Sequence, residues 1–141
     1  MPLSELISDR WEKANYLKFG EGASIYDLSY VFGDVKVGEN TWVGPFTILD
    51  GSGGLEIGDN CSISAGVQIY SHESVQWAVS GSTQNYNYQP TLIGNNVYIG
   101  PNCVIAMGVI IGDHTIIGAN SFVNKSYPAN SKIAGNPAKP I

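Results

Sequence analysis

The chain has 141 residues, of which 43% are hydrophobic and 13% charged, and its formal net charge is −5. This length suits one domain with a single continuous core. No run approaches the roughly 20 apolar residues of a membrane-spanning helix, no signal segment opens the chain, and an acidic chain without a basic stripe disfavours nucleic acid as a partner. We therefore expect a soluble cytoplasmic protein.

Residues 1–20 are expected to form an N-terminal cap. Ser4 can cap a short helix, with Glu5 favourable in its first turn. The apolar residues at helical spacing are Leu3, Leu6, Ile7 and Trp11. Such a helix would cover an open end of the core, because an uncapped end exposes unpaired strand edges.

From residue 25 onward an aliphatic residue recurs every six positions. The first series is Ile25, Val31, Val37, Val43 and Leu49, continued by Ile57, Ile63 and Ile69. A period of six fits neither a helix nor a plain strand, but it fits a coil of short strands joined by tight turns. Three hexads make one triangular turn of eighteen residues, and successive turns stack as parallel strands. A slip of two residues at Gly51-Ser52-Gly53-Gly54 predicts a small bulged corner.

The repeat covers residues 25–72, stops, and resumes over residues 91–128. The second series is Ile93, Ile99, Ile105, Ile111, Ile117 and Val123. Residues 73–90 lack the pattern and are expected to form an extruded loop. Residues 129–141 close the chain as a C-terminal segment of the same single domain.

Both cysteines and the charge distribution fit this arrangement. Cys61 and Cys103 occupy the fifth position of a hexad, where a small buried side chain is required, so we interpret them as packing residues. Residues 1–73 carry eleven acidic and four basic side chains, whereas residues 74–141 carry one acidic and three basic side chains. An anionic ligand would therefore bind the C-terminal half, although three lysines could equally serve solubility.

Several motifs together resemble the hexapeptide-repeat acyltransferases. They are the hexads, His72 at the mouth of the loop, the block Ile93-Gly94-Asn95-Asn96-Val97-Tyr98-Ile99-Gly100, and the ending Ile133-Ala134-Gly135-Asn136-Pro137-Ala138-Lys139. Within that superfamily the chain looks most like galactoside and maltose acetyltransferases, xenobiotic acetyltransferases and the sugar acetyltransferases of surface-polysaccharide biosynthesis.

The resemblance implies an all-β fold, a left-handed parallel β-helix with a short N-terminal helix and one extruded loop. It also implies a homotrimer with active sites at the subunit interfaces, and acetyl-CoA as the co-substrate. The handedness comes from the resemblance alone, because parallel crossovers are right-handed in about 98% of cases.

Acetyl transfer needs a base that removes a proton from the acceptor, and His72 is the candidate because imidazole titrates near neutral pH. Glu73 could orient His72, although adjacent side chains in an extended segment point apart. Gly100 is the candidate oxyanion donor. In galactoside-type relatives the donor lies just after the Ile-Gly pair, where this chain has Pro101, which has no N–H.

The resemblance places coenzyme A along the coils. The residues matching positions that bind it are Gly100, Ala119, Asn124, Lys125, Asn136, Pro137 and Lys139. Lysines beside phosphates also make independent physical sense. Each residue taken separately could be only a turn residue or a solvated charge.

The acceptor is expected beside the loop, whose residues 74–90 include no charged side chain. Trp77, Tyr86 and Tyr88 could bind the apolar face of a sugar ring, or could equally anchor the loop against an adjacent subunit. Asp50 is expected to contact an acceptor hydroxyl or amine. A metal-dependent hydratase of the γ-carbonic-anhydrase type needs three His ligands, and the chain has only His72 and His114, so no metal is expected.

The sequence thus predicts an acetyltransferase that moves an acetyl group directly from acetyl-CoA to a hydroxyl or amino group of a sugar or nucleotide sugar. A xenobiotic O-acetyltransferase and a non-catalytic β-helix scaffold remain open. A serine acetyltransferase is disfavoured, because it would carry more histidines and a long helical N-terminal domain, and this sequence shows neither feature.

Overall fold

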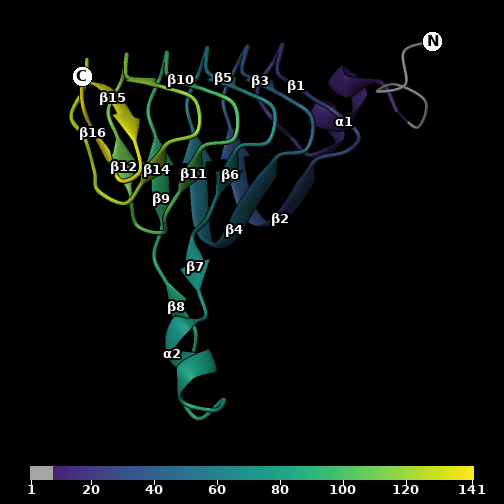
Figure 1. Ribbon diagram of the computed structural model, residues 1–141. Helices are drawn as coiled ribbons and strands as arrows, with labels where there is room; N and C mark the ends of the chain where they lie inside the picture. Colours follow the sequence, from purple (N-terminus) through teal and green to yellow (C-terminus); the bar gives the residue numbers. More distant parts are fainter. Residues whose placement is uncertain (1–7) are drawn as a thin grey trace.

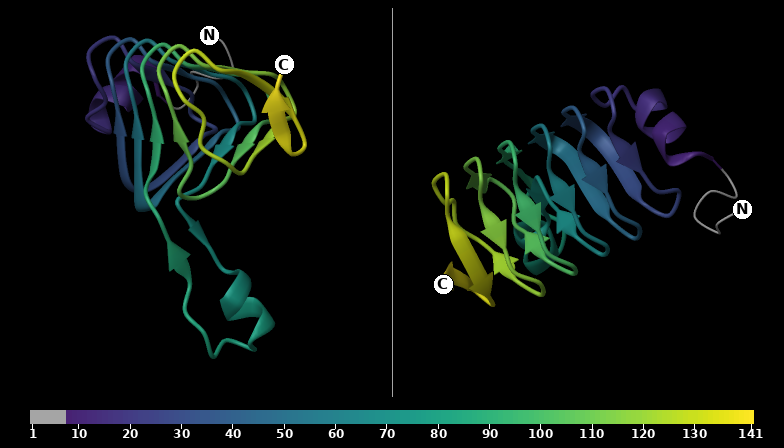
Figure 2. Two further views of the ribbon diagram at one scale, coloured as in Figure 1. Left: turned by 90° about the vertical axis from the view of Figure 1, so that its left-hand side faces the viewer. Right: turned by 90° about the horizontal axis from the view of Figure 1, so that it is seen from above.

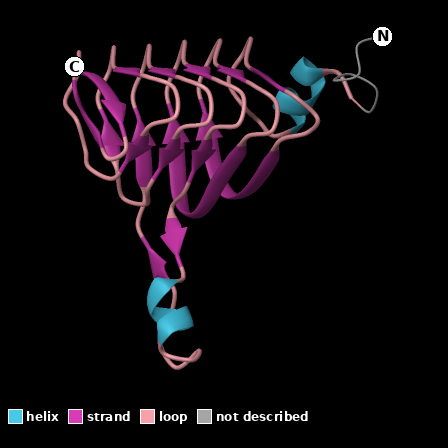
Figure 3. Cartoon of the chain, viewed as in Figure 1, coloured by secondary structure: helices cyan, strands magenta, loops and turns pink. Residues whose placement is uncertain are grey.

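The protein is a triangular solenoid with one projecting hairpin, as Figure 1 shows for the computed structural model, which describes residues 8–141. The strands stack parallel to one another along one axis, and the two helices lie at the N-terminal end and on the hairpin (Figure 3). This arrangement confirms the β-helix predicted from the six-residue period.

Three faces surround the core. The first is a sheet of β1 (Ser24–Ile25), β3 (Trp42–Val43), β5 (Ser62–Ile63), β10 (Tyr98–Ile99), β13 (Ile116–Ile117) and β15 (Lys132–Gly135). The second contains the first halves of β2 (Tyr30–Val37) and β4 (Ile48–Ile57), with β6 (Gln68–Ile69), β11 (Val104–Ile105) and β14 (Phe122–Val123). The third contains the second halves of β2 and β4, with β9 (Thr91–Ile93) and β12 (Ile110–Ile111).

The repeating aliphatic side chains fill the core of the coil. On the first face, the inward residues with 0% exposure are Ile25, Val43, Ile63, Ile99, Ile117 and Ile133. Ile99 pairs with Ile117 in parallel register, eighteen residues further along the chain, which is one turn of the coil. Cys61 and Cys103 are also buried, and neither forms a disulfide bond. Burial raises the pKa of both thiols, which keeps them protonated and agrees with their interpretation as packing residues.

The coil is left-handed. Viewed from the C-terminal end, the chain runs clockwise while it advances toward the viewer (Figure 2, left). The right-handed rule describes strands joined by a crossover helix, whereas these strands are joined by tight corners. Many corners place one residue in the left-handed backbone region, including Asn40, Asn96 and Asn120 with φ of 54° to 59°. His114 takes the same corner position with φ of 58°, in keeping with a structural role.

Helix α1 (Arg10–Tyr16) covers the N-terminal end of the coil (Figure 1). Asp9 caps it by accepting hydrogen bonds from the backbone N–H groups of Trp11 and Glu12. Lys13 donates from Nζ to the carbonyl oxygens of Tyr26, Asp27 and Ser29, at 2.6, 3.2 and 3.0 Å. Through Lys13, the helix therefore supplies a hydrogen-bond donor to three carbonyl oxygens of the first coil. The helix start expected at Ser4 lies outside the described residues.

The loop between β6 and β9 projects away from the coil as a hairpin (Figure 1). Its stem pairs β7 (His72–Glu73) with β8 (Asn87–Tyr88) in antiparallel register. Its tip contains the short helix α2 (Val75–Val79), which the sequence analysis did not anticipate. At the opposite end of the chain, β15 turns back into β16 (Ala138–Pro140) as a second hairpin.

Candidate active site

A two-residue bulge in β4 lies next to the base of the projecting hairpin. Val31 and Val37 of β2 are six residues apart, whereas their partners in β4, Leu49 and Ile57, are eight residues apart, and the pairing shifts between Gly33 and Val35. The predicted slip is therefore a bulge within a continuous strand that bends from the second face to the third. It exposes Ser52, which follows the buried Asp50 by two residues.

Asp50 accepts hydrogen bonds on both carboxylate oxygens although its side chain is fully buried. Oδ1 accepts from the N–H and the hydroxyl of Ser52, at 2.8 and 2.5 Å. Oδ2 accepts from the N–H of Ser71 at 3.1 Å and from Nδ1 of His72. Burial alone would raise the pKa of Asp50, but these hydrogen bonds outweigh it and lower the pKa below its ordinary value. Asp50 is therefore a carboxylate at neutral pH.

The contact with Asp50 favours the tautomer of His72 that carries its hydrogen on Nδ1. A carboxylate can only accept a hydrogen bond, so Nδ1 carries the hydrogen and Nε2 of the neutral ring keeps its lone pair. The imidazole is partly accessible, with 25% of its side chain exposed. A partly exposed imidazole with a buried carboxylate behind Nδ1 has the arrangement that general-base catalysis requires.

Glu73, the expected orienting residue, is not the carboxylate that contacts His72. In the hairpin stem His72 lies opposite Tyr88, and Glu73 lies opposite Asn87. Glu73 accepts a hydrogen bond from the Asn87 side-chain amide at 3.3 Å. Adjacent residues of a strand point to opposite faces, which gives His72 and Glu73 different neighbours. Asp50, expected to bind the acceptor, takes the place beside the imidazole instead.

Aromatic side chains surround the His72 ring. Tyr86 and Tyr88 stack with it at centroid distances of 6.0 and 6.2 Å, and Tyr70 meets it edge-on at 6.3 Å. Trp77 packs edge-on against Tyr86 at 5.6 Å. The structure therefore brings together three aromatics that the sequence analysis selected from the loop, and Tyr70 joins them from the end of β6.

Two hollows flank this cluster. The first, about 550 Å³, is lined by Trp77, Asn85, Tyr86 and Tyr88, none of which is charged. The second, about 310 Å³, lies between the hairpin base and the second face of the coil. Its lining is mostly apolar and consists of Tyr70, His72, Glu73, Val104, Ala106, Met107 and Phe122. His72 thus lies beside both a neutral polar-aromatic hollow and an apolar one.

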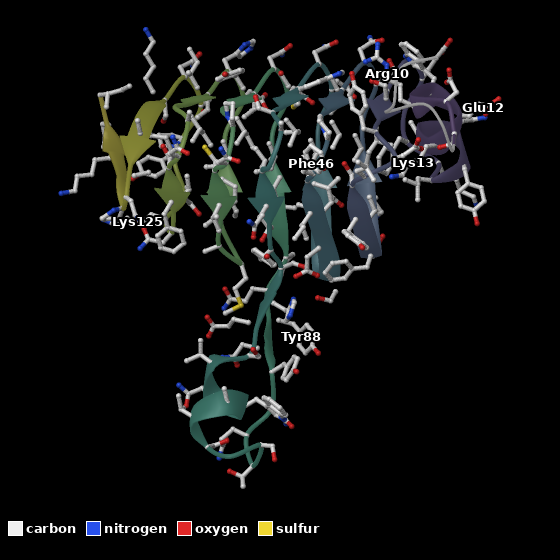
Figure 4. All side chains as sticks on the ribbon, turned by 45° about the vertical axis from the view of Figure 1, so that its right-hand side comes forward. Arg10, Glu12, Lys13, Phe46, Tyr88 and Lys125 are labelled. Atoms are coloured by element: carbon white, nitrogen blue, oxygen red, sulfur yellow. The ribbon has the colours of Figure 1, made fainter. Side chains whose placement is uncertain are left out.

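The residues expected to bind coenzyme A lie further toward the C-terminal end. Asn124 and Lys125 directly follow β14, which is two strands along the second face from β6, and both are exposed. Figure 4 shows Lys125 at that end of the coil and Tyr88 on the hairpin. Ala119 precedes β14 at the opposite edge of the same face. Asn136 and Pro137 form the exposed turn between β15 and β16, and Lys139 lies exposed on β16.

The oxyanion role expected for Gly100 conflicts with its hydrogen bonding. Its N–H donates to the carbonyl oxygen of Ile117 at 2.9 Å, as part of the ladder on the first face. A donor already engaged in a sheet is not free to stabilise a developing oxyanion. The close stacking of Gly100 on Ala119 instead explains the glycine, because an added Cβ would lie 2.6 Å from the Ala119 nitrogen.

Three residues of the site were absent from the sequence-based selection. Ser52 and Ser71 contact the Asp50 carboxylate, and Tyr70 borders His72. Burial and the Asp50 charge raise the pKa of Tyr70, so its hydroxyl stays protonated and donates to Gln68 at 2.7 Å. A signal for Ser52 was present, because the Gly-rich slip in the repeat marks the bulge that carries it. Within residues 8–141, no group of three His, Cys, Asp or Glu side chains could hold a metal ion.

Comparison with known families matches the two halves of the coil separately. Residues 34–71 match the hexapeptide repeat of succinyl-transferase, and residues 90–125 match the bacterial transferase hexapeptide (six repeats). The unmatched residues 72–89 between them contain the projecting hairpin.

Several relatives are named as acetyltransferases. Galactoside O-acetyltransferase of Escherichia coli K12 is 33% identical over 125 residues, which cover 74% of this chain and 62% of that protein. The chain therefore spans less than two thirds of the length of this relative. A maltose O-acetyltransferase from Clostridium difficile 630 has 30% identity and a TM-score of 0.75, covering 98% of this chain and 78% of that one. A galactoside acetyltransferase in complex with coenzyme A has 28% identity and a TM-score of 0.82, covering 100% and 72% of the two chains.

Proposed function

Because this chain belongs to the hexapeptide-repeat acyltransferase family, we propose that it transfers an acetyl group from acetyl-CoA to a hydroxyl or amino group of a sugar. The observation that carries the proposal is the His72 imidazole, whose Nδ1 is bound to buried Asp50 and whose ring stacks with Tyr86 and Tyr88, two residues that line a neutral aromatic hollow. The three relatives described above are named as acetyltransferases of a galactoside or of maltose, which supports a sugar as the acceptor class.

The proposed reaction is a direct transfer between two bound substrates. Nε2 of His72 takes the proton from the acceptor hydroxyl or amine as that group attacks the thioester carbonyl. Asp50 stabilises the imidazolium that forms, without taking the proton itself. The tetrahedral intermediate then expels the coenzyme A thiolate, and the imidazolium returns the proton to the sulfur. No covalent bond to the enzyme forms at any step.

We assign coenzyme A to the C-terminal side of His72. The apolar hollow over Ala106 and Phe122 suits the pantetheine arm, and it leads along the second face toward Asn124 and Lys125. Lys125 and Lys139 are exposed, and neither forms one of the ion pairs found within residues 8–141, so both can pair with phosphate groups. Ala119, Asn136 and Pro137 remain proposed contacts of the same ligand.

We assign the acceptor to the aromatic hollow. Aromatic rings pack against the apolar face of a sugar, and Asn85 supplies a neutral hydrogen-bonding group. Between Lys36 and Lys125 the chain has no Lys or Arg, and the charged side chains beside His72 are the carboxylates Asp50 and Glu73. A diphosphate needs cationic partners, so this charge pattern favours a neutral sugar over a nucleotide sugar.

A homotrimer with active sites at its interfaces is part of the proposal. Large apolar side chains remain exposed around one hollow of the coil, with Tyr30 at 75%, Phe46 at 64% and Leu28 at 49% exposed. Contiguous exposed apolar surface commonly marks a protein interface. We propose a cytoplasmic location for the enzyme, as expected from its sequence. No helix within residues 8–141 has the length and hydropathy needed to span a bilayer.

An acceptor panel tests the proposed function. The release of free coenzyme A thiol from acetyl-CoA would be measured with neutral hexoses and their glycosides, amino sugars, nucleotide sugars and hydroxylated antibiotics. We expect the highest kcat/KM with a neutral sugar or glycoside. Preference for an antibiotic would favour the xenobiotic alternative. Absence of both turnover and coenzyme A binding, measured by calorimetry, would favour a non-catalytic scaffold.

A further inference from the structure

We propose that Ser52 is a positioning residue that holds the Asp50–His72 pair in one protonation arrangement, a role that rests on the proposed function of His72 as the base. The hydroxyl of Ser52 lies 2.5 Å from Oδ1 of Asp50 and 3.1 Å from Nδ1 of His72. It therefore touches both members of the pair, and it does so from the bulge that interrupts the repeat.

The directions of these hydrogen bonds follow from the donors available. A serine hydroxyl has one hydrogen, and the nearby carboxylate of Asp50 is the stronger acceptor, so Ser52 donates to Oδ1. Its oxygen is then free to accept from Nδ1–H of His72. That N–H is consequently shared between Oδ2 of Asp50 and Oγ of Ser52. Both partners favour the proton on Nδ1, which leaves Nε2 as the basic nitrogen.

The bulge explains how an exposed serine reaches a buried carboxylate. Strand β2 has one residue, Asp34, between Gly33 and Val35, whereas β4 has three residues, Ser52, Gly53 and Gly54, between their partners Gly51 and Leu55. The inserted Gly53 donates its N–H to the Ser71 hydroxyl at 2.9 Å. A Cβ at Gly53 would lie 2.2 Å from the Ser71 carbonyl oxygen, so the bulge packs tightly against the segment that leads into His72. The insertion therefore ties β4 to the residue preceding the base.

A purely structural role for Ser52 would predict different behaviour. The N–H of Ser52 already donates to Oδ1 of Asp50 at 2.8 Å, and this backbone bond survives any side-chain substitution. If the hydroxyl only supported the bulge, its loss would lower stability without altering the imidazole. The hydroxyl contact with His72 predicts an effect on the ring itself, and the two roles separate in an experiment that observes the ring directly.

The test uses Ser52→Ala and Ser52→Thr in the full chain, each with His114→Asn so that His72 is the single histidine. Asn occupies the equivalent corner in other coils, so His114→Asn should fold normally. Ring nitrogens would be observed by long-range ¹H–¹⁵N correlation spectra above the titration range of imidazole. We expect the tautomer protonated on Nδ1 to dominate in the parent and in Ser52→Thr, and a smaller fraction of it in Ser52→Ala, where Asp50 is the only one of the two acceptors left to favour the hydrogen on Nδ1.

Kinetics provide the second readout. We expect Ser52→Ala to lower kcat roughly 10- to 150-fold with little change in the KM for acetyl-CoA, which corresponds to loss of one hydrogen bond to a charged group. Ser52→Thr should recover most of the loss. Ser29→Ala is the matched control, because the Ser29 hydroxyl links neighbouring coils through Gly44 and Thr47.

The outcomes separate the two proposals. An unchanged tautomer in Ser52→Ala, or equal loss of activity in the Ala and Thr variants, would overturn the positioning role. If the parent protein shows no turnover with any acceptor but the tautomer shift occurs as expected, the positioning of His72 stands and the proposed acetyl transfer fails.

Discussion

Replacing Asp50 by Asn removes the charge behind His72 while keeping the shape of the side chain. The carboxylate accepts four hydrogen bonds, two on each oxygen, and every partner is a donor. An amide presents one oxygen and one NH₂ group, so its NH₂ must face either the two Ser52 donors or the Ser71 and His72 donors. In the second orientation the imidazole can only adapt by moving its hydrogen to Nε2, the nitrogen that has to accept the proton.

The magnitude follows from these lost contacts. Two donors facing an NH₂ group lose their partners, at about 1–3 kcal/mol each, so we expect the free energy of unfolding to fall by about 2–6 kcal/mol. A hydrogen bond to a charged group contributes about 1.5–3 kcal/mol, which already equals a roughly 10- to 150-fold loss in kcat. The wrong tautomer can raise that loss to about 10⁴-fold, as it does when the Asp of a Ser-His-Asp protease is replaced by Asn.

The assay is release of coenzyme A thiol at saturating substrates, with coenzyme A binding measured by calorimetry in the same preparation. Asp113→Asn is the matched control, because Asp113 accepts a backbone hydrogen bond from Asn95 at 2.7 Å, and Asn95 itself fills the equivalent place one coil earlier. We expect Asp113→Asn to retain full activity. A kcat for Asp50→Asn within threefold of the parent would refute the role of Asp50.

Three further predictions concern pH, the acceptor hollow and the N-terminal cap. The pKa of Asp50 is lowered in the folded state, so its stabilising contribution is present above about pH 4 and is lost as the pH falls through the folded pKa. The free energy of unfolding, measured by urea titration between pH 5 and pH 2.5, should therefore decrease less steeply with falling pH in Asp50→Asn than in the parent. Tyr86→Ala should raise the KM for the acceptor roughly 2- to 10-fold and leave the KM for acetyl-CoA unchanged. Tyr16→Ala, which alters a residue that is 86% exposed, is the control. Equal effects of Tyr86→Ala on both KM values would contradict the assignment of the acceptor to the aromatic hollow. Lys13→Met should lower unfolding free energy by about 1–3 kcal/mol in urea titrations because three carbonyl oxygens lose their donor, whereas Lys36→Met, which breaks an exposed ion pair of 3.7 Å, should cost under about 1 kcal/mol.

The coil could be predicted because its information is local and repeated. Each buried aliphatic, such as Ile99 or Ile117, is followed by a corner that needs a small or left-handed residue, and the same pattern recurs every six positions. The hand of the coil did not follow from general rules, because those rules describe crossover helices. It came from the family resemblance.

The site was only partly predictable because its contacts join distant positions. His72 and the aromatics of the loop stood out by residue type and by the break in the repeat. The pairing of His72 with Asp50, 22 residues earlier, depends on how one coil stacks on the next and on the bulge at Ser52. Gly100 was assigned from a motif, and its N–H proved to be part of the sheet ladder. Hydrogen-bond engagement of a backbone group is a property of the stacked coils, which the motif alone does not reveal.

The central claim is that His72 acts as the base in acetyl transfer. Its most direct test is the turnover of His72→Ala with the best acceptor of the panel, measured alongside coenzyme A binding and the oligomeric state. We predict that kcat falls at least about 100-fold while coenzyme A binding and the assembly remain those of the parent. Near-normal turnover in the variant would contradict the account.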